Sequence, residues 1–268
     1  MGIRFWQVDA FAERPFAGNP AAVVPLERPA PEPWMRALAA EMNLSETAFL
    51  WPEGDALRLR WFTPEAEIRL CGHATLASAH VLWQSGRLAA GAPARFETLS
   101  GRLTAHRDGE SIRLDFPAHR LVPVAAPAGL EAALGAPIRE TLKASDDYLV
   151  RVADEWAVRA LTPDFGVLAK LGVRGVIVTA PADAGRDFDF VSRFFAPGVG
   201  VDEDPVTGSA HCALSPYWSA QLGRDELVGF QASRRSGRVG VRLVGDRVHL
   251  LGRAVTVFEG ELSDAAGV

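Results

Sequence analysis

One pattern occurs twice in this sequence, and the duplication limits the folds that the chain can adopt. The first copy has RWFTP at residues 60–64, an acidic loop, and the helix-like run GHATLASAHVLWQSG at 72–86. The second has RFFAP at 193–197, another acidic loop, and GSAHCALSPYWSAQLG at 208–223. Seven residues separate RWFTP from the helix-like run in the first copy, and ten residues separate RFFAP from its run in the second. The loop of the second copy is therefore three residues longer. This agreement in order predicts two halves with the same architecture.

Both helix-like runs are apolar nearly all round, with Ala, Ser and Thr where a surface helix carries Lys or Glu. Such helices are buried on most sides, and their small side chains let strands approach closely. Each run stops at a glycine, Gly86 or Gly223, which suits the left-handed position after a helix. We therefore predict a mixed α/β (α+β) fold of two pseudo-symmetric halves, each a mostly antiparallel strand barrel wrapped around a central helix. Pro216 lies inside the second run and is expected to kink or divide it.

The segments around these runs read mainly as strands separated by turns. PEPWMRALAAEMN, at residues 31–43, is the exception and predicts an early helix, whereas EWAVRALT at 155–162 reads as a strand. A proline-rich joint near residues 117–128 marks a plausible boundary. We predict an N-terminal domain over residues 1–117 and a C-terminal domain over 118–268, and the last strand can return to the N-terminal domain.

The composition is that of an ordinary globular protein, with 268 residues, 48% of them hydrophobic and 23% charged. A net charge of −5 and a pI of about 5.7 argue against nucleic acid or an anionic membrane as a partner. No apolar run reaches the length of about eighteen residues that a membrane span needs. The N-terminal stretch reads as a strand rather than a signal peptide, so we expect a cytoplasmic protein.

The usual cofactor signatures are missing from the sequence. The only cysteines are Cys71 and Cys212, too few for a four-thiolate zinc site, and a structural disulfide is not expected in the cytoplasm. The only lysines are Lys143 and Lys170. Neither has a phosphate-binding glycine run nearby, so a Schiff base with pyridoxal phosphate is not expected. There is no G-x-G-x-x-G after a strand, no Walker loop and no H-E-x-x-H. The residues themselves thus offer none of the common cofactor-binding motifs.

The starts of the two buried helices are candidate binding sites. A helix N-terminus presents unpaired backbone N–H groups and a partial positive charge, which favour a small anion such as a carboxylate. Gly72 and Gly208 let a ligand approach the backbone. In a duplicated fold the two starts can face one another across the domain junction. The alternative is that DEDPVTGSAHCAL, at residues 202–214, is an ordinary acidic loop that caps an exposed helix.

Several titratable side chains near these helix starts are candidates for proton transfer: Glu46, Cys71, His73, Asp204 and Ser209. Each also has a purely structural interpretation. For Glu46 this interpretation is a solvated residue at a strand end, and for Asp204 it is a solvated acid in a loop. His73 fits a capping or packing residue, Ser209 fits a helix cap, and Cys71 fits a small buried hydrophobe.

Taken together, five stretches of the sequence resemble the PhzF family, the phenazine-biosynthesis isomerases and their relatives. They run in order from the first strand to the last: VDAFAERPFAGNPAAVV, LSETAFL, RWFTPEAEIRLCGHATLASAHVL, DEDPVTGSAHCAL and GRAVTVFEGEL. The resemblance also places the chain in the wider fold group of diaminopimelate epimerase, which consists of two pseudo-symmetric barrels, each around a central helix. It implies a cofactor-independent isomerase, without a metal, that is commonly a homodimer.

The resemblance also implies roles for individual residues. Glu46, in the SETA motif, matches the general acid/base that moves a proton on the substrate, and His73 matches a residue that contacts the substrate and assists proton handling. Asp204 matches the third catalytic position, in the DPVTGS motif.

The same motifs imply a set of substrate-binding residues. Backbone N–H groups near Gly72, His73, Gly208 and Ser209 would hold a substrate carboxylate. Asn19, in the GNP motif, lines the pocket or simply forms a turn. Arg69 is an unusual charge so near the helix start, and it could alter the choice of substrate.

The cysteines discriminate between two mechanisms in this fold group. Racemases and epimerases of the group use one thiol per half, each just before its helix-opening glycine. Cys71 precedes Gly72, but Thr207 precedes Gly208, and Cys212 lies about one turn inside its helix. A two-thiol mechanism is therefore disfavoured. The leading hypothesis is an isomerase that moves a proton on a small conjugated carboxylate. The alternatives are an epimerase or racemase of a small amino or imino acid, and a non-catalytic protein that binds a small ligand on the same scaffold.

Overall fold

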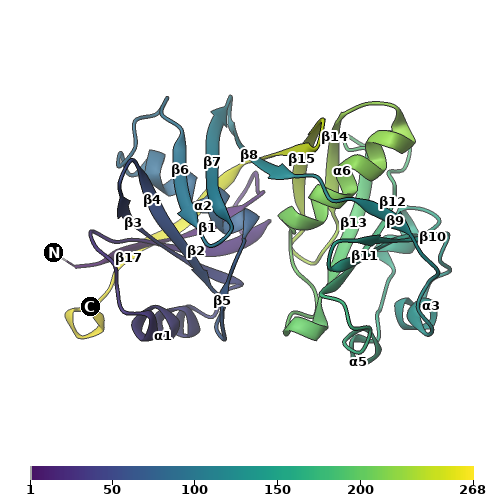
Figure 1. Cartoon of the computed structure of the whole chain (residues 1–268), viewed down its shortest axis with the longest axis horizontal. Helices are drawn as coiled ribbons and strands as arrows, with labels where there is room; N and C mark the ends of the chain where they lie inside the picture. The colour runs from purple at the N-terminus through teal and green to yellow at the C-terminus, as the bar shows by residue number, and fades with distance from the viewer. Residues whose placement is uncertain (1) are drawn as a thin grey trace. The chain divides into compact units, whose positions relative to one another are not determined.

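The computed structural model describes residues 2–268, which divide into two units. Unit 1 comprises the described residues up to Asp115 together with Leu251–Val268, and unit 2 comprises Phe116–Leu250. The boundary predicted from the sequence lies after residue 117, and the prediction allows the last strand to belong to either domain. That strand, β17 (Ala254–Glu261), pairs antiparallel with β1 (Arg4–Ala10) in unit 1, where Figure 1 shows the two lying side by side.

Unit 1 consists of strands around one buried helix, with a second helix on the outside. Besides β1 and β17, its strands are β2 (Asn19–Pro25), β3 (Glu46–Glu53), β4 (Ala56–Phe62), β5 (Glu67–Ile68), β6 (Ala94–Thr98), β7 (Gly101–Asp108) and β8 (Ser111–Pro117), which ends at the unit boundary. Its helices are α1 (Glu32–Met42), α2 (Gly72–Gln84) and the short 3-10 helix η2 (Asp264–Ala266).

The strands of unit 1 pair mainly in antiparallel fashion. β1 pairs antiparallel with β2, β3 with β4, β4 with β5, β6 with β7, and β7 with β8, while β2–β3 and β4–β6 are parallel. Helix α2 packs against β1, β2, β3, β7 and β17 and is buried from His73 almost to its end. Its alanines and serines let the surrounding strands come close, so the barrel around a central helix that the sequence predicts is confirmed for this unit.

Helix α1 forms where the sequence predicts it and covers β3 and β4 from outside. Its apolar side, with Met35 and Leu38, joins a core cluster that includes Phe49 and Phe62. Asn43 ends the helix in the left-handed conformation, which asparagine tolerates better than most residues.

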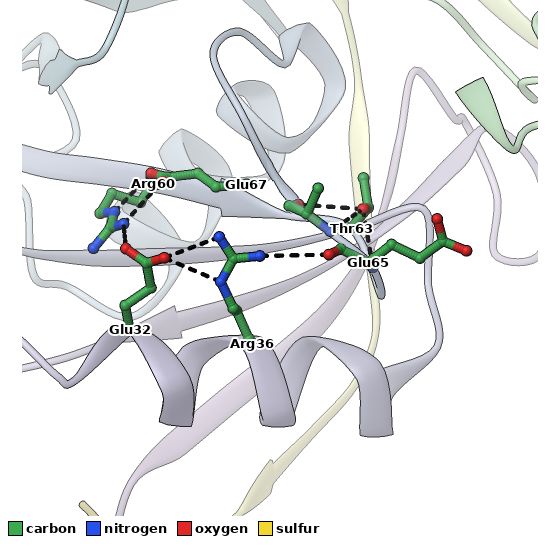
Figure 2. A network of polar contacts seen from close by, with 7 residues as sticks. Glu32, Arg36, Arg60, Thr63, Glu65 and Glu67 are labelled. Atoms are coloured by element: carbon green, nitrogen blue, oxygen red, sulfur yellow. Dashed lines mark hydrogen bonds and ion pairs between the residues drawn. The ribbon is translucent and has the colours of Figure 1, made fainter. Parts of the chain in front are cut away.

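A polar network ties α1 to the β4–β5 hairpin, as Figure 2 shows. Arg60 donates to both carboxylate oxygens of Glu67 at 2.7 Å and to Glu32 at 2.7 Å. Arg36 donates to Glu32 as well, at 2.9 and 3.0 Å, so Glu32 joins the two arginines. The hairpin leads directly into α2, and the network therefore fixes the approach to that helix.

Unit 2 repeats this plan with additional short helices. Its strands are β9 (Leu121–Pro123), β10 (Glu140–Ala144), β11 (Asp147–Arg151), β12 (Gly175–Pro181), β13 (Phe190–Phe195), β14 (Glu226–Gln231), β15 (Gly237–Val244) and β16 (Arg247–Gly252), which ends at the unit boundary. Its helices are α3 (Leu130–Leu134), α4 (Glu155–Arg159), α5 (Phe165–Leu168), the 3-10 helix η1 (Pro197–Val199) and α6 (Gly208–Leu222).

The strand pairing confirms the duplication. In unit 2, β11–β12 is parallel, β12–β13 antiparallel, β13–β14 parallel and β14–β15 antiparallel. The same alternation joins β2, β3, β4, β6 and β7 in unit 1. Helix α6 is buried like α2 and packs on β14 and β15. The predicted fold class is therefore confirmed.

The two copies of the Arg-aromatic-Phe motif also make equivalent contacts. Arg60 stacks over Phe62 at 5.0 Å and bonds Glu67, and Arg193 stacks over Phe195 at 4.8 Å. Arg193 bonds both carboxylate oxygens of Glu203, at 2.7 and 3.0 Å. Each glutamate stands five residues before the first residue of its buried helix, so the three extra residues of the second loop lie between arginine and glutamate.

Two local expectations have definite outcomes. Helix α6 is continuous from Gly208 to Leu222, so Pro216 does not divide it. Proline has no N–H for the carbonyl four residues earlier, and this carbonyl, on Cys212, instead accepts from His119 N at 2.9 Å.

The prediction of a strand at residues 155–162 is wrong. Glu155–Arg159 is a short helix, because the Asp154 side chain accepts from Ala157 N at 2.8 Å and caps its start.

Among the described residues, no helix combines the length and the apolar character that crossing a membrane requires.

Candidate functional site

In unit 1, Glu46 stands at the first position of β3. The strand is clamped between its parallel neighbour β2 and its antiparallel neighbour β4, and the residues from Thr47 to Trp51 are buried. The Glu46 side chain is 14% exposed, so its carboxylate lies at the edge of the core rather than in open solvent. This disagrees with the interpretation of Glu46 as a solvated strand end.

The start of α2 brings the next candidates to the same place. Cys71, the N-cap residue, is extended with φ −141 and ψ 111, and among the described residues its side chain makes no capping hydrogen bond. A helix start without a side-chain cap keeps its first backbone N–H groups available for another acceptor. Gly72 and His73 open the helix, and the His73 side chain is only 6% exposed.

The side chains of Asn19, Glu46, Cys71 and His73 form one cluster. His73 Nε2 lies 2.9 Å from Glu46 Oε2. His73 Nδ1 lies 3.2 Å from Asn19 Nδ2 and 3.5 Å from Cys71 Sγ. Glu46 and His73 are therefore in ion-pair contact through Oε2 and Nε2.

The cluster shifts the pKa values of two of its members. Burial raises the pKa of the Cys71 thiol to about 11, with a further contribution from the Glu46 charge. Burial alone would lower the pKa of His73, but charges on Cys71 and Glu46 and hydrogen bonds to both outweigh it and raise that pKa well above its usual value. At neutral pH the sulfur is a thiol, so Glu46 is the anionic partner of the imidazole.

The surroundings of His73 accept either charge state of its ring. In an imidazolium, Nε2–H points at Glu46 and Nδ1–H can be donated to the Cys71 sulfur. In a neutral ring with its proton on Nε2, Nδ1 accepts from the Asn19 amide. The pair of Glu46 and His73 can therefore hold one proton and pass it on, which is what an acid/base site requires.

In unit 2, a second cluster surrounds the start of α6. Thr207 is the extended N-cap residue, and its hydroxyl donates to Asp204. Gln231, fully buried on β14, holds this turn with both ends of its amide: Oε1 accepts from Thr207 N at 2.9 Å and Nε2 donates to Asp204 O at 2.7 Å. Asp204 is thus an ordered turn residue, not a freely solvated loop acid.

Arg174, which contacts Ser209, and Asp147, which holds Arg174, were not among the residues predicted from the sequence. Arg174 Nη2 donates to Ser209 Oγ at 3.0 Å, and the same guanidinium makes a bidentate pair with buried Asp147, with Nε–Oδ1 at 2.9 Å. Burial opposes the charge on Arg174, but the hydrogen bonds and charge of Asp147 raise its pKa. Because Ser209 Oγ accepts from Arg174, its own hydrogen is directed elsewhere and is available to an anion at the helix start. No sequence motif marks Arg174 or Asp147, because Asp147 opens β11 and Arg174 lies directly before β12, 27 residues further along the chain.

Two other residues considered in the sequence, Cys212 and Arg69, lie outside these clusters. Cys212 is buried one turn inside α6, where its Sγ donates to Gly208 O at 3.6 Å. Arg69 is exposed and donates to Leu99 O at 3.3 Å. The only thiol at a buried helix start among the described residues is therefore Cys71, and Thr207 occupies the equivalent position in unit 2.

One group of side chains could hold a metal ion. Among the described residues, ligand atoms of Glu46, Cys71 and His73 all lie within 4.8 Å of one another. The donor set of carboxylate oxygen, sulfur and imidazole nitrogen suits a borderline-soft ion such as zinc rather than magnesium or calcium.

With this geometry established, comparisons with known proteins become informative. The family model described as "Phenazine biosynthesis-like protein" matches residues 8–260. A relative named "Uncharacterized isomerase" from Pseudomonas aeruginosa is 50% identical, over 98% of this chain and 99% of the relative. A crystal structure of a phenazine biosynthesis protein of the PhzF family from Enterococcus faecalis is 44% identical with a TM-score of 0.93, over 98% of this chain and all (100%) of the other.

A more distant neighbour bears on the fold alone. The structure of a probable proline racemase from Agrobacterium radiobacter, solved with bound carbonate, has a TM-score of 0.64 at 15% identity, over 98% of this chain and 93% of the other. The fold is thus shared with that protein. The family match spans nearly the whole length, and the close relatives are covered end to end: the chain belongs to the PhzC-PhzF family of phenazine biosynthesis-like proteins.

Proposed function

We propose that this protein is a cofactor-independent isomerase that moves a proton on a small conjugated carboxylate, with Glu46 as its single carboxylate acid/base. The observation that carries the proposal is the contact of Glu46 with His73 at the uncapped start of α2, 2.9 Å between Oε2 and Nε2. The name of the Pseudomonas relative, an isomerase, supports the reaction class.

The first step is proton abstraction. The Glu46 carboxylate takes a proton from a carbon next to the conjugated system, and the electron pair moves into that system toward the substrate's carboxylate or carbonyl oxygen. Backbone N–H groups at Gly72 and His73 stabilise the charge that develops there. The proton, shared between Glu46 and His73, then returns to a different carbon of the same molecule. Positioned acid/base groups of this kind contribute about two to four orders of magnitude in rate.

We propose that the cluster at the start of α6 also serves the substrate. Gly208 and Ser209 would donate hydrogen bonds to an anionic group, with Arg174 directing the Ser209 hydroxyl as described above. Asp204, held by Thr207 and Gln231, would assist proton handling. Asn19 would keep the His73 ring in place. A Ser209→Ala variant is expected to raise KM more than it lowers kcat, because a lost ground-state contact weakens binding first.

The direct test of the proposal uses Glu46→Gln. Wild-type protein is incubated in deuterated water with a panel of small conjugated carboxylates, and NMR records deuterium uptake and new regioisomers. Glu46→Gln should lower the rate at least about a hundredfold, since the amide cannot take a proton. Glu41→Gln, on the exposed side of α1, is the matched control and should behave like wild type. A Glu46→Gln variant that turns over at the wild-type rate contradicts the proposal.

The same experiment distinguishes the alternatives. An epimerase or racemase of a small amino or imino acid would exchange the hydrogen of a stereocentre and invert its configuration without giving a regioisomer. The thiol pattern argues against it, because Thr207 replaces the second cysteine. A binding protein without turnover would bind a carboxylate but incorporate no deuterium from any member of the panel.

Two further properties stay predictions. We propose a homodimer, which light scattering on the purified protein would check. We also propose a cytoplasmic location, which fractionation of the source cells would check.

A further inference from the structure

The thiol of Cys71 has no task in the proton transfer proposed above, although it lies in the same cluster. It is buried, its sulfur is 4.0 Å from His73 Nε2, and Glu46 Oε2 is 2.9 Å from that same nitrogen. Sulfur, nitrogen and oxygen donors thus surround one point from three side chains. This arrangement needs an explanation that acid/base catalysis does not supply.

We propose that Glu46, Cys71 and His73 form a zinc-binding site, and that zinc bound there inhibits the enzyme. The binding rests on the geometry of the three side chains alone. The inhibition rests on the proposed function, because a metal that occupies Glu46 and His73 removes the proposed acid/base.

The distances fit a tetrahedral ion after small adjustments. Zinc binds sulfur at about 2.3 Å and imidazole nitrogen or carboxylate oxygen at about 2.0–2.2 Å, so neighbouring donors in a tetrahedron lie about 3.2–3.7 Å apart. The three donor atoms here lie within 4.8 Å of one another, with individual separations of 2.9 and 4.0 Å. Side-chain movements of about 1 Å would bring all three into contact with one ion, and a water would complete the tetrahedron.

Charge also favours a divalent ion at this position. Zinc binding would convert the Cys71 thiol to a thiolate, and its proton would go to solvent. Thiolate and carboxylate together then neutralise the two charges of the ion, so no net charge is left in the buried cluster.

The neighbouring side chain supports the ligand role of His73. A histidine that binds metal through Nε2 keeps its hydrogen on Nδ1, and a second polar group normally receives it. The Asn19 amide nitrogen lies 3.2 Å from His73 Nδ1, and a flip of the amide would place its oxygen there to accept this hydrogen. The Glu46 side chain is 14% exposed, so the cluster lies at the edge of the core.

The experiment uses cobalt as a spectroscopic substitute for zinc. Titration of the wild-type protein with cobalt(II) should produce the near-ultraviolet absorption of a sulfur-to-cobalt charge transfer, and zinc should abolish it by displacement. Cys71→Ser should lose the band and weaken zinc binding, measured by calorimetry, at least about tenfold. Cys212→Ser is the matched control, because Cys212 is the only other cysteine and lies inside α6, and this variant should keep the band.

A second measurement needs no variant. Zinc K-edge absorption of the wild-type protein with one equivalent of zinc should show one sulfur at about 2.3 Å, with the remaining neighbours nitrogen or oxygen. A site without sulfur, or a cobalt band that survives Cys71→Ser, overturns the proposal. The inhibition is measured separately on deuterium exchange, where Cys71→Ser should need at least about tenfold more zinc for the same inhibition. If no substrate turns over, the spectra still decide the metal site, so the two proposals fail independently.

Discussion

At the scale of single residues, the unit-1 cluster contains one carboxylate in contact with one imidazole, and its thiol is protonated at neutral pH. Glu46 and His73 are in contact at 2.9 Å, and burial holds the pKa of Cys71 at about 11. A sulfur that stays protonated at neutral pH is a poor base. These properties support our proposal that the carboxylate and the ring, rather than the thiol, carry the chemistry of the unit-1 cluster.

The raised pKa of His73 predicts how stability depends on pH. Unfolding returns the ring to its ordinary pKa of about 6.5, so between that pH and its folded-state pKa the folded protein binds one more proton than the unfolded chain. The stabilisation from His73 is complete below about pH 6.5 and is lost as pH rises through the folded-state pKa. The free energy of unfolding should fall by at most about 1.4 kcal/mol per pH unit in this window.

Urea denaturation between about pH 6.5 and 7.5, below the ordinary cysteine pKa of about 8.5, measures this slope. His73→Gln should remove the contribution of His73, while the same substitution at the partly exposed His106 on β7 should retain it. Identical slopes for wild type and His73→Gln would show that Glu46 does not hold a proton on the ring.

At the scale of elements, each buried helix is preceded by a salt bridge between the strand before it and the loop that leads to it. Arg60 holds Glu67 ahead of α2, and Arg193 holds Glu203 ahead of α6. Arg193 also donates to Leu161 O at 2.8 Å. These contacts fix the loops whose last residues, Cys71 and Thr207, set the direction of the helix starts.

Loss of Arg193 should therefore be costly. Its side chain is 13% exposed and that of Glu203 is 19% exposed, so Arg193→Leu leaves a largely buried carboxylate without its partner. We expect a loss of about 3 kcal/mol in the free energy of unfolding, measured by urea denaturation. The control is Arg253→Leu, which removes an ion pair with Glu110 in which both partners are well exposed (46% and 79%) and should leave the midpoint nearly unchanged. A small effect at Arg193 would mean that the loop is held by other contacts.

At the scale of the whole molecule, the duplicated halves have diverged in chemistry while keeping their architecture. Glu46 pairs with Ala21 across β2–β3, and Gly175 pairs with Asp147 at the equivalent place in β11–β12. One half carries a carboxylate at the start of this strand, and the other carries a glycine. At the helix starts, His73 in unit 1 corresponds to Ser209 in unit 2. This divergence supports an acid/base in one half and a hydrogen-bond donor in the other.

The structure of unit 2 also predicts that no side chain can be restored at Gly175. A Cβ there would lie 2.4 and 2.6 Å from the Phe194 ring and 2.9 Å from Phe195 O. Gly175→Ala should therefore destabilise the protein by about 2 kcal/mol, measured by thermal or urea unfolding. Gly91→Ala, where a Cβ would meet nothing within 4 Å, is the control and should be nearly neutral. An equally mild Gly175→Ala would show that Phe194 can move away.

Much of the fold could be predicted from the sequence because the duplicated motif carries strong local signals. The all-round apolar runs at 72–86 and 208–223 identified the buried helices, and the glycines after them, Gly86 and Gly223, adopt positive φ of 72 and 68. The helix at Glu155 was missed because its alternating residues resemble a strand, and the Asp154 cap outweighs that pattern.

The candidate site was only partly visible in the sequence. Glu46, His73 and Asn19 lie in motifs, and the structure brings them together, although their catalytic roles stay predictions. Arg174 and Asp147 could not be found from the sequence. Their pairing depends on the parallel β11–β12 contact, a long-range feature that no local pattern encodes.

The proline within α6 has a consequence for how unit 2 is tethered. Without Pro216, the Cys212 carbonyl would be occupied by the helix's own backbone, and His119 N would lose the acceptor that now binds it at 2.9 Å. Pro216 thus leaves a backbone carbonyl in the middle of α6 available, and the segment that enters unit 2 is hydrogen-bonded to it. Replacing this proline with a better helix former would strengthen the helix and release the segment attached to it.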